Sequence, residues 1–279
     1  LVARPPVFGG TVKQLAADRA RAVRGVKQVL QVPSGVAVVA DSFWAAKKGR
    51  DALEIDWESG PASAVDTDSL RADYARLAKT PGARVSRVGD VEAALGTAAK
   101  RVSAEYDMPY LAHAPMEPLN CLVSLAPDRC QIWTGTQFQT VDQANAARAA
   151  GLRPEQVEIN TLFLGGGFGR RATPSSDFIV EAVHVAKAAG APVKTIWTRE
   201  DDLRGAYYRP MWNSAISAGL DAGGKPVAWK HTIVGQSVTE GTPFAGATIK
   251  DGVDQTSVEG AAVLPYTVPA IAVDLHSPK

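Results

Sequence analysis

Short apolar runs and helical patterns alternate along the first hundred residues. The run from Gly35 to Ala40 is continuously apolar and strand-sized, which is typical of a buried strand. A helix is expected to follow it, with Asp41 or Ser42 as the N-cap. The same pattern predicts helices over 42–53, 66–79 and 91–99 and strands at 54–57 and 85–88. We therefore expect a small mixed α+β unit that ends near Lys100.

Longer strands dominate after that point. An extended apolar run over 157–164 leads into a glycine-rich stretch, and a helix is expected after Pro174-Ser175-Ser176. Residues 240–279 have only weak periodicity, so we predict no element there. The remaining predictions are strands at 101–108, 121–126, 131–136 and 193–197, a helix at 141–150 with Gly151 as its C-cap, and a hairpin of 212–220 with 226–234. The expected fold class is α+β with mixed sheets.

The glycine-rich stretch, residues 164–171, reads Leu-Gly-Gly-Gly-Phe-Gly-Arg-Arg. Glycine admits positive φ and a close approach to the backbone, and successive N–H groups in such a turn form a nest for an anion or an oxo ligand. Arg170 and Arg171 are expected to add positive charge beside it. A P-loop is excluded because no Gly-Lys-Ser/Thr follows, and no βαβ unit of the usual size supports a dinucleotide site. The alternative is a tight strand-to-helix turn without a ligand.

The composition removes several classes of partner. With 30 Lys+Arg against 29 Asp+Glu, the formal net charge of +1 gives no electrostatic footprint for nucleic acid or a membrane surface. No apolar run approaches the roughly 18 residues of a membrane span. The chain starts at Leu1 without an initiator methionine and stops at Lys279 without a closing element, so we expect a piece of a longer chain.

The two cysteines are expected to be buried thiols. If residues 126–129 close a hairpin, Leu125 faces Cys130 and Cys121 faces Thr134, which sets the two sulfur atoms several residue pairs apart. A disulfide is therefore not expected, and the spacing encodes no metal cluster.

Three sets of residues around the glycines could carry chemistry. His113 and Glu117 lie in a proline-bounded loop, Gln137 follows a predicted strand, and a charged segment at 199–202 leads to Arg209. Each also has a plain structural interpretation: a hydrogen-bonding histidine, a satisfied strand-end amide and a solvated turn. No nucleophile elbow and no His-Glu-x-x-His motif is present, so hydrolase chemistry and a protein-ligated metal are not expected.

Taken together and in order, these motifs resemble the large subunits of molybdenum hydroxylases, the xanthine dehydrogenase and aldehyde oxidase superfamily. The motifs are Trp133-Thr-Gly-Thr-Gln137, the glycines at 165–169, and Arg199-Glu-Asp-Asp202 followed by Arg209-Pro210. His113-Ala-Pro-Met-Glu-Pro118 and Phe168-Gly-Arg-Arg171 look most like the isoquinoline 1-oxidoreductase β-subunit branch, which includes membrane-associated aldehyde dehydrogenases. The resemblance implies a truncated α/β-hammerhead domain at 1–99 and the first part of a molybdopterin-binding α+β region at 100–279.

The resemblance also implies site residues. The family's glutamine that matches Gln137 bonds a ligand oxygen of molybdenum, and the backbone matching Phe168 and Gly169 approaches the same centre. The assigned cofactor-binding set is Gln137, Gly166, Gly167, Phe168, Gly169 and Arg170, with Arg209 as a substrate contact. Xanthine-type members have Gly-Lys-Glu where Arg170-Arg171-Ala172 stands here, so purine specificity is not expected. The family's catalytic glutamate lies beyond the position of Lys279, so no catalytic residue is assigned and this piece alone is expected to be inactive.

The resemblance further implies the cofactors and partners of the complete protein. These are a molybdenum-molybdopterin cytosine dinucleotide, a [2Fe-2S] small subunit that receives electrons, and in some members a cytochrome c subunit. The implied reaction is hydroxylation of an aldehyde or an N-heterocyclic carbon with oxygen from water. A periplasmic or membrane-associated location is expected, with the cytoplasm as the alternative. The competing hypothesis is a non-catalytic α+β module whose glycine loop binds an anionic ligand or a partner's backbone.

Overall fold

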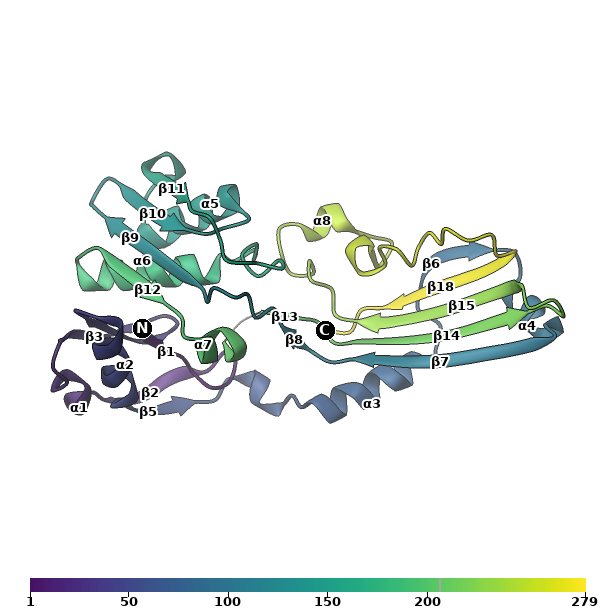
Figure 1. Ribbon diagram of the computed structural model, residues 1–279, viewed down its shortest axis with the longest axis horizontal. Helices are drawn as coiled ribbons and strands as arrows, with labels where there is room; N and C mark the ends of the chain where they lie inside the picture. The colour runs from purple at the N-terminus through teal and green to yellow at the C-terminus, as the bar shows by residue number, and fades with distance from the viewer. Residues whose placement is uncertain (206) are drawn as a thin grey trace. The chain divides into compact units, whose positions relative to one another are not determined.

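A computed structural model describes residues 1–205 and 207–279 and shows a mixed α+β chain, as the sequence predicts. The chain forms two compact units, and each is assembled from two separate segments (Figure 1). The first unit holds residues 1–64 and 112–207, and the second holds 65–111 and 208–279. These units do not follow the expected boundary near residue 100, because β7 (Lys100–Met108) pairs with β14 (Trp212–Leu220). The assignment of 1–99 and 100–279 to two family domains stays a prediction.

Three sheets make up the first unit. Their strand orders are β1-β4-β3, β2-β5 and β11-β10-β9-β12. Their bounds are β1 (Val2–Ala3), β2 (Thr11–Ala16), β3 (Val26–Val32), β4 (Gly35–Ala40), β5 (Glu54–Glu58), β9 (Asn120–Leu125), β10 (Cys130–Thr134), β11 (Val157–Thr161) and β12 (Val193–Ile196). The strands β1, β2 and β3 were not predicted, whereas β4 has the predicted bounds.

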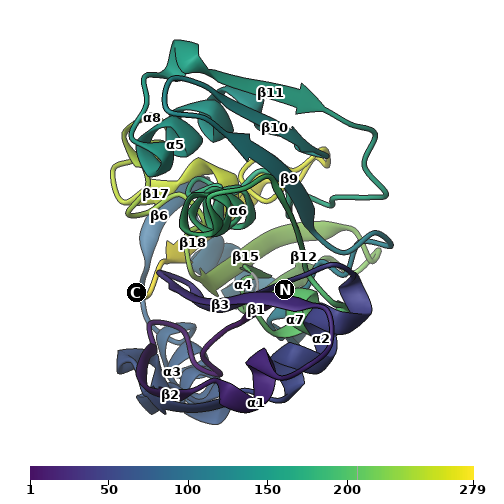
Figure 2. The same cartoon turned by 90° about the vertical axis from the view of Figure 1, so that its left-hand side faces the viewer.

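The helices of the first unit are α1 (Asp18–Arg21), α2 (Phe43–Asp51), α5 (Gln139–Ala150), α6 (Asp177–Ala189) and α7 (Arg199–Arg204), with 3₁₀ turns at Pro61–Ala64 and Pro154–Gln156. Helices α2 and α5 lie close to their predicted positions and α6 follows Pro174-Ser175-Ser176 as expected, whereas α1 and α7 were not predicted. Ser42 caps α2 by accepting a hydrogen bond from the Ala45 N–H, and Gly151 ends α5 with φ +81°. The two predicted caps are therefore confirmed. Helix α6 contacts the strand β9 (Figure 2).

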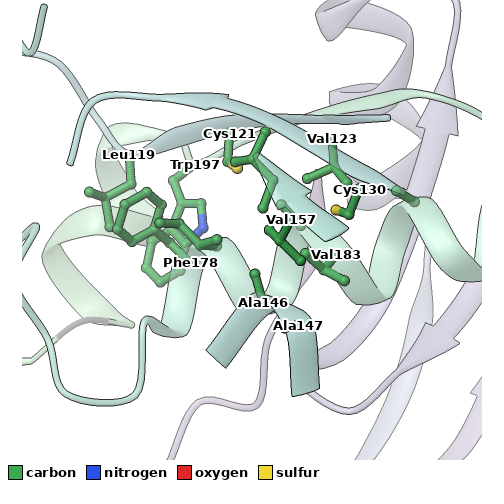
Figure 3. Packing of buried hydrophobic residues seen from close by; sticks show 14 residues of the cluster. Leu119, Cys121, Val123, Cys130, Ala146, Ala147, Val157, Phe178, Val183 and Trp197 are labelled. Carbon is green, nitrogen blue, oxygen red and sulfur yellow. The ribbon is translucent and has the colours of Figure 1, made fainter. Parts of the chain in front are cut away.

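The core of the first unit lies between the four-stranded sheet and the helices α5 and α6 (Figure 3). Cys121 and Cys130 are buried in it and unbonded, and their registers with Thr134 and Leu125 are the predicted ones. Burial raises the pKa of the Cys130 thiol to about 11 and raises the pKa of Cys121 further. The prediction of two buried thiols without a disulfide is confirmed.

A five-stranded sheet forms the second unit, with the order β6-β18-β15-β14-β7. The predicted hairpin is confirmed as β14 with β15 (Pro226–Gly235), and α3 (Thr67–Leu77) and α4 (Val91–Thr97) pack on the sheet. The segment without a predicted element contributes β18 (Ala270–His276), which lies parallel to β15. The other elements are β6 (Ala83–Val88), β13 (Tyr208–Arg209), β16 (Ile249–Lys250), β17 (Val253–Asp254), α8 (Ala245–Thr248) and a 3₁₀ turn at Gln255–Ser257. The short strand β8 (Leu111–Ala112) has its first residue in the second unit and its second residue in the first unit. In the part of the chain that the structure describes, no helix is long and apolar enough to cross a membrane.

Candidate functional site

The glycine loop, residues 164–171, connects β11 to the segment before α6, as predicted. Three of its residues have positive φ: Gly166 at +95°, Phe168 at +54° and Gly169 at +94°. A tight turn closes where the Arg170 N–H donates to the Gly167 carbonyl at 2.9 Å. Since Phe168 is not a glycine, its left-handed conformation is unfavourable and must be held by its surroundings. Its side chain is 77% exposed and therefore does not supply that support.

Four successive N–H groups of this loop have no acceptor in the described chain, and they belong to two exposed residues (Phe168 and Gly169), one half-buried residue (Gly166) and one buried residue (Gly167). Among residues 1–205 and 207–279, no acceptor lies within hydrogen-bonding range of the N–H groups of Gly166, Gly167, Phe168 and Gly169. A Cβ added at Gly169 would meet no atom within 4 Å, so this part of the loop faces open space. Consecutive unpaired backbone donors are the nest that the sequence predicts for an anionic or oxo ligand.

Gln137 lies directly against this loop. Its N–H donates to the Arg171 carbonyl at 3.1 Å, and its Oε1 accepts from the Arg171 N–H at 3.3 Å. A Cβ on Gly167 would stand 2.4 Å from that Oε1, so a residue larger than glycine cannot occupy position 167 without displacing the amide. The Gln137 side chain is exposed, and its Nε2 donates to no acceptor in the described chain. The structure thus brings the predicted glutamine and the predicted glycines together.

Both arginines of the loop point inward rather than toward the open N–H groups. Arg170 and Arg171 are each only 1% exposed. Arg170 makes a two-pronged ion pair with Asp177, at 2.9 and 2.7 Å, and its guanidinium lies 5.5 Å from the centre of the Trp197 ring. Both guanidinium groups lie on the buried side of the loop, each paired with a carboxylate, and the expectation that they add charge beside a ligand stays a prediction. The assignment of Arg170 as a cofactor contact also stays a prediction.

Glu117, which was not among the assigned residues, contacts the loop at several atoms. Its Oε2 accepts from the Gly165 N–H and from Arg171 Nη2, both at 2.9 Å, and its own N–H donates to the Gly165 carbonyl at 3.0 Å. Ala114, three residues earlier, has φ +45°, which is a second unfavourable backbone conformation beside the loop. The sequence signal for this contact was the proline-bounded segment 113–118, but nothing in it pointed to Gly165.

A layer of buried polar groups lies behind the arginines. Asp202 of α7 pairs with Arg199 at 3.0 Å, while its Oδ1, His113 Nδ1 and Arg170 Nε are buried without a hydrogen-bond partner among the described residues. Burial raises the pKa of Asp202 against the attraction of Arg199 and Arg170, and burial lowers the pKa of His113. His113 is thus partly buried, and its Nδ1 does not make the hydrogen bond that its structural interpretation expected.

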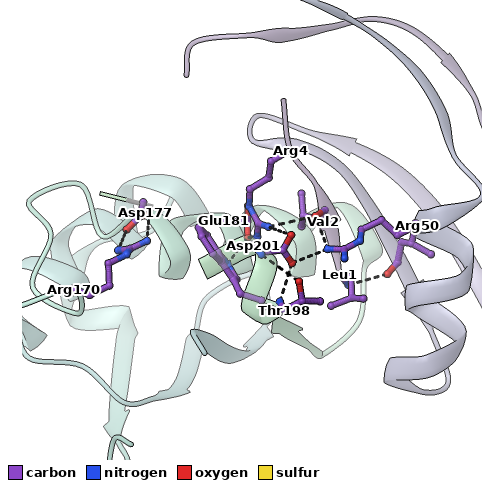
Figure 4. A network of polar contacts seen from close by, with 11 residues as sticks. Leu1, Val2, Arg4, Arg50, Arg170, Asp177, Glu181, Thr198 and Asp201 are labelled. Carbon is purple, nitrogen blue, oxygen red and sulfur yellow. Dashed lines mark hydrogen bonds and ion pairs between the residues drawn. The ribbon is translucent and has the colours of Figure 1, made fainter. Parts of the chain in front are cut away.

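Figure 4 shows the ion pairs that join Arg4, which follows β1, and Arg50 of α2 to residues of α6 and α7. Arg4 pairs with Glu181 and stacks 3.7 Å from the centre of the Trp197 ring, and Arg50 pairs with Asp201 at 2.6 Å. Trp197 donates to Glu181 at 2.9 Å. The charged segment after Trp197 is therefore the start of helix α7, capped by Thr198, rather than the solvated turn that was the alternative.

Arg209 belongs to the second unit and donates to the Pro109 carbonyl at 2.6 Å. Its role as a substrate contact stays a prediction. Across residues 1–205 and 207–279, no group of three or more His, Cys, Asp or Glu side chains could hold a metal ion. The open N–H groups and the Gln137 amide are therefore the features of this site that suit a ligand.

Several known proteins are similar to this chain in sequence and in fold. The model of the molybdopterin cofactor-binding domain family matches residues 77–277. The isoquinoline 1-oxidoreductase subunit beta of Brevundimonas diminuta is 30% identical over 248 residues, which cover 85% of this chain and 32% of the relative. The aldehyde oxidoreductase molybdenum-binding subunit PaoC of Escherichia coli (strain K12) is 26% identical over 206 residues, covering 74% and 28%.

A solved structure of the aldehyde oxidoreductase from Desulfovibrio gigas superposes on this chain with a TM-score of 0.69 at 19% identity, and it covers 98% of this chain and 34% of that one. This likeness shows the fold. The chain spans about a third of the length of the curated relatives it matches.

Proposed function

The chain belongs to the molybdopterin cofactor-binding domain family, whose model matches residues 77–277, and from this premise we propose that its glycine loop and Gln137 hold a molybdenum cofactor. The observation that carries the proposal is the row of four N–H groups from Gly166 to Gly169 that no described residue accepts from. Such a row binds oxygen atoms that carry negative charge. The relative PaoC is by name a molybdenum-binding subunit of an aldehyde oxidoreductase, and the site of this chain offers unpaired backbone and amide donors.

Both the backbone of the glycine loop and the side-chain amide of Gln137 would donate hydrogen bonds to the cofactor. The loop N–H groups would donate to oxo or pterin-phosphate oxygens, and the free Gln137 Nε2 would donate a further bond from the strand end. Because Arg171 and Glu117 already fix the loop, the donors need little rearrangement when the ligand arrives. When bound, the molybdenum centre supplies the two-electron oxidation and the delivery of oxygen from water.

We propose further that the complete protein hydroxylates an aldehyde or an N-heterocyclic aromatic carbon and passes the electrons to a [2Fe-2S] partner subunit. The printed names of the relatives, an isoquinoline 1-oxidoreductase subunit and an aldehyde oxidoreductase subunit, support both substrate classes. The proposed form of the cofactor is the cytosine dinucleotide. No residue of this chain is assigned as the catalytic base.

Metal and pterin analysis tests this proposal. The protein that carries this chain would be purified with its partner subunits from a host that makes the cofactor, and we expect about one molybdenum and one pterin dinucleotide per large subunit. Gln137→Ala removes the amide, and Gly167→Ala places a Cβ 2.4 Å from Gln137 Oε1. Both variants are expected to lose most of the metal.

The matched control is Gly96→Ala in α4, where a Cβ would meet no atom within 4 Å. It is expected to keep the wild-type metal content. Folded wild-type protein without molybdenum would reject the cofactor proposal. Full metal content in both site variants would reject the assignment of this loop.

A second candidate rests on the same open N–H groups. A non-catalytic module could use them to hold an anionic ligand or the carbonyl groups of a partner. That reading predicts ligand binding by protein made in a host that lacks the molybdenum cofactor, with an affinity that Gly167→Ala lowers. Calorimetric titration with inorganic phosphate on such protein separates the two candidates.

A further inference from the structure

We propose that Glu117 is a positioning residue that, with Arg171, latches the glycine loop in its open shape before any ligand is bound. The inference rests on the proposed function, because it concerns how the same loop is prepared for its cofactor. Glu117 lies 48 residues before Gly165 and touches it through both backbone and side chain. No assigned site residue contacts Gly165 in this way.

Arg171 is the other half of the latch, and it joins three segments of the chain. Its Nε donates to the Gly166 carbonyl at 3.0 Å, Nη1 to the Gly135 carbonyl at 3.2 Å, and Nη2 to the carbonyl and the carboxylate of Glu117, both at 2.9 Å. One rigid, fully buried guanidinium therefore ties the glycine loop to the end of β10 and to the loop that holds Glu117. A lysine offers donors from a single point and cannot reproduce this fork.

Glu117 supplies the only counter-charge that reaches Arg171 by an ion pair in the described chain. Asn120 donates to its other oxygen at 2.9 Å, which fixes the carboxylate so that Oε2 faces both Gly165 and Arg171. Because a buried guanidinium without a counter-charge is strongly unfavourable, the loss of this carboxylate should disturb Arg171 and the segments that it contacts.

The close contact with Glu117 also requires a glycine at position 165. A Cβ at this residue would stand 2.6 Å from the Cβ of Glu117, so the two backbones can approach only when residue 165 has no side chain. The short approach lets the Gly165 N–H point at the carboxylate, while the N–H groups of the next four residues are left unpaired. The contact with Glu117 thus uses one donor of the loop and leaves four without an acceptor, of which those of Phe168 and Gly169 belong to exposed residues.

Holding these donors in place is also a matter of backbone conformation. Phe168 and Ala114 have φ of +54° and +45°, which a free chain rarely adopts at residues other than glycine. They lie on the two segments that Glu117 and Arg171 bind together. A loop released from the contacts of Glu117 and Arg171 is expected to leave these conformations and to change the orientation of its N–H groups.

Hydrogen exchange tests the latch directly, without any cofactor. Glu117→Gln keeps the shape of the side chain but removes its charge, and we expect the amide of Gly165 to exchange at least about tenfold faster, as the loss of a hydrogen bond to a charged group implies. Glu117→Asp keeps the charge but withdraws the carboxylate by one methylene, so it should also fail to protect Gly165. A role limited to neutralising Arg171 predicts instead that aspartate restores the wild-type rate.

The matched control is Glu158→Gln, which breaks the exposed pair of Glu158 with Arg129 in the same unit. It should leave the exchange of peptides within 162–172 unchanged. Wild-type exchange in Glu117→Gln, or equal acceleration in the control, would overturn the latch.

A second readout uses the loaded protein, where Glu117→Gln is expected to release molybdenum during dialysis at least about tenfold faster than the wild type. If the wild-type protein carries no molybdenum, the cofactor proposal fails and hydrogen exchange alone judges the latch. If the wild type is loaded and Glu117→Gln releases metal at the same rate, the latch fails and the cofactor proposal stands.

Discussion

The ion pair of Arg170 with Asp177 should be one of the most sensitive points of the first unit. Asp177→Asn is nearly isosteric, but it removes the charge opposite a guanidinium that is 1% exposed. Its amide would also turn a donor toward one of the two arginine nitrogens that Asp177 now accepts from, at 2.9 and 2.7 Å. Since Thr173 donates to the same carboxylate, a further bond is weakened.

The magnitude follows from the burial of the pair. Breaking a fully buried pair by removing one partner costs about 3–5 kcal/mol. Because the Asp177 side chain is 25% exposed, solvent screens part of this interaction, and we expect about 2–3 kcal/mol of destabilisation. Urea titration of the purified protein, followed by the fluorescence of Trp197 and the other tryptophans, measures the change as a lower midpoint.

The matched double variant Arg170→Met with Asp177→Leu removes both charges. Apolar replacement of a buried pair is often neutral, so the double variant is expected to recover much of the stability that Asp177→Asn loses. Its effect separates the cost of an unpaired charge from the loss of packing against Trp197, which lies 5.5 Å from the guanidinium. An Asp177→Asn midpoint equal to that of the wild type would refute the view that this pair holds the loop from beneath.

Two further predictions concern acid and thiol chemistry. Burial alone would raise the pKa of Glu117, but hydrogen bonds from Gly165 and Asn120 and the charge of Arg171 outweigh it, so the pKa lies below its ordinary value of 4.5. The carboxylate therefore stabilises the fold above pH 4.5, and this effect is lost as the pH falls through the lowered pKa. Glu117→Gln should therefore reduce the loss of stability at acid pH in a profile of unfolding free energy against pH. An acid limb equal to that of the wild type would contradict this. Cys121 and Cys130 are buried and have raised pKa values, so both should resist a thiol reagent in native buffer and react fully in denaturant. Rapid labelling in native buffer would instead show that the core opens.

Local signals in the sequence predict much of this fold. The caps at Ser42 and Gly151 and the turn between β14 and β15 are set by a few neighbouring residues, and the structure confirms them. The strand β18 was missed because its partner β15 lies more than thirty residues earlier, and parallel pairing leaves no turn signal between them. The compact units were missed for a related reason, since residues 112–207, the second segment of the first unit, separate β7 from its neighbour β14 in the sequence.

The contact of Gln137 with the glycine loop agrees with the sequence prediction, whereas the direction of the arginine side chains does not. The motifs placed Gln137 beside the glycines, and the register of β10 against β11 brings the two strand ends together. The direction of Arg170 and Arg171 depends instead on the left-handed residues Phe168 and Gly169, which no periodicity reports. Glu117 could not be assigned because its contact with the loop is a tertiary one.

The glycines of the loop look alike in the sequence, but each is required for a different structural reason. Gly165 makes room for Glu117, Gly167 makes room for Gln137, and Gly169 is needed for its φ of +94° in open space. The shape of the loop is therefore imposed by neighbours that lie beneath and beside it, while the exposed Phe168 side chain contributes little support. It follows that substitutions at Glu117 or Gln137 should change ligand retention more than the truncation Phe168→Ala, whose backbone can keep the same hydrogen-bonding direction. The comparison is made on folded protein by metal content, and a larger loss in Phe168→Ala than in Glu117→Gln would place the ligand against the aromatic ring rather than on the backbone.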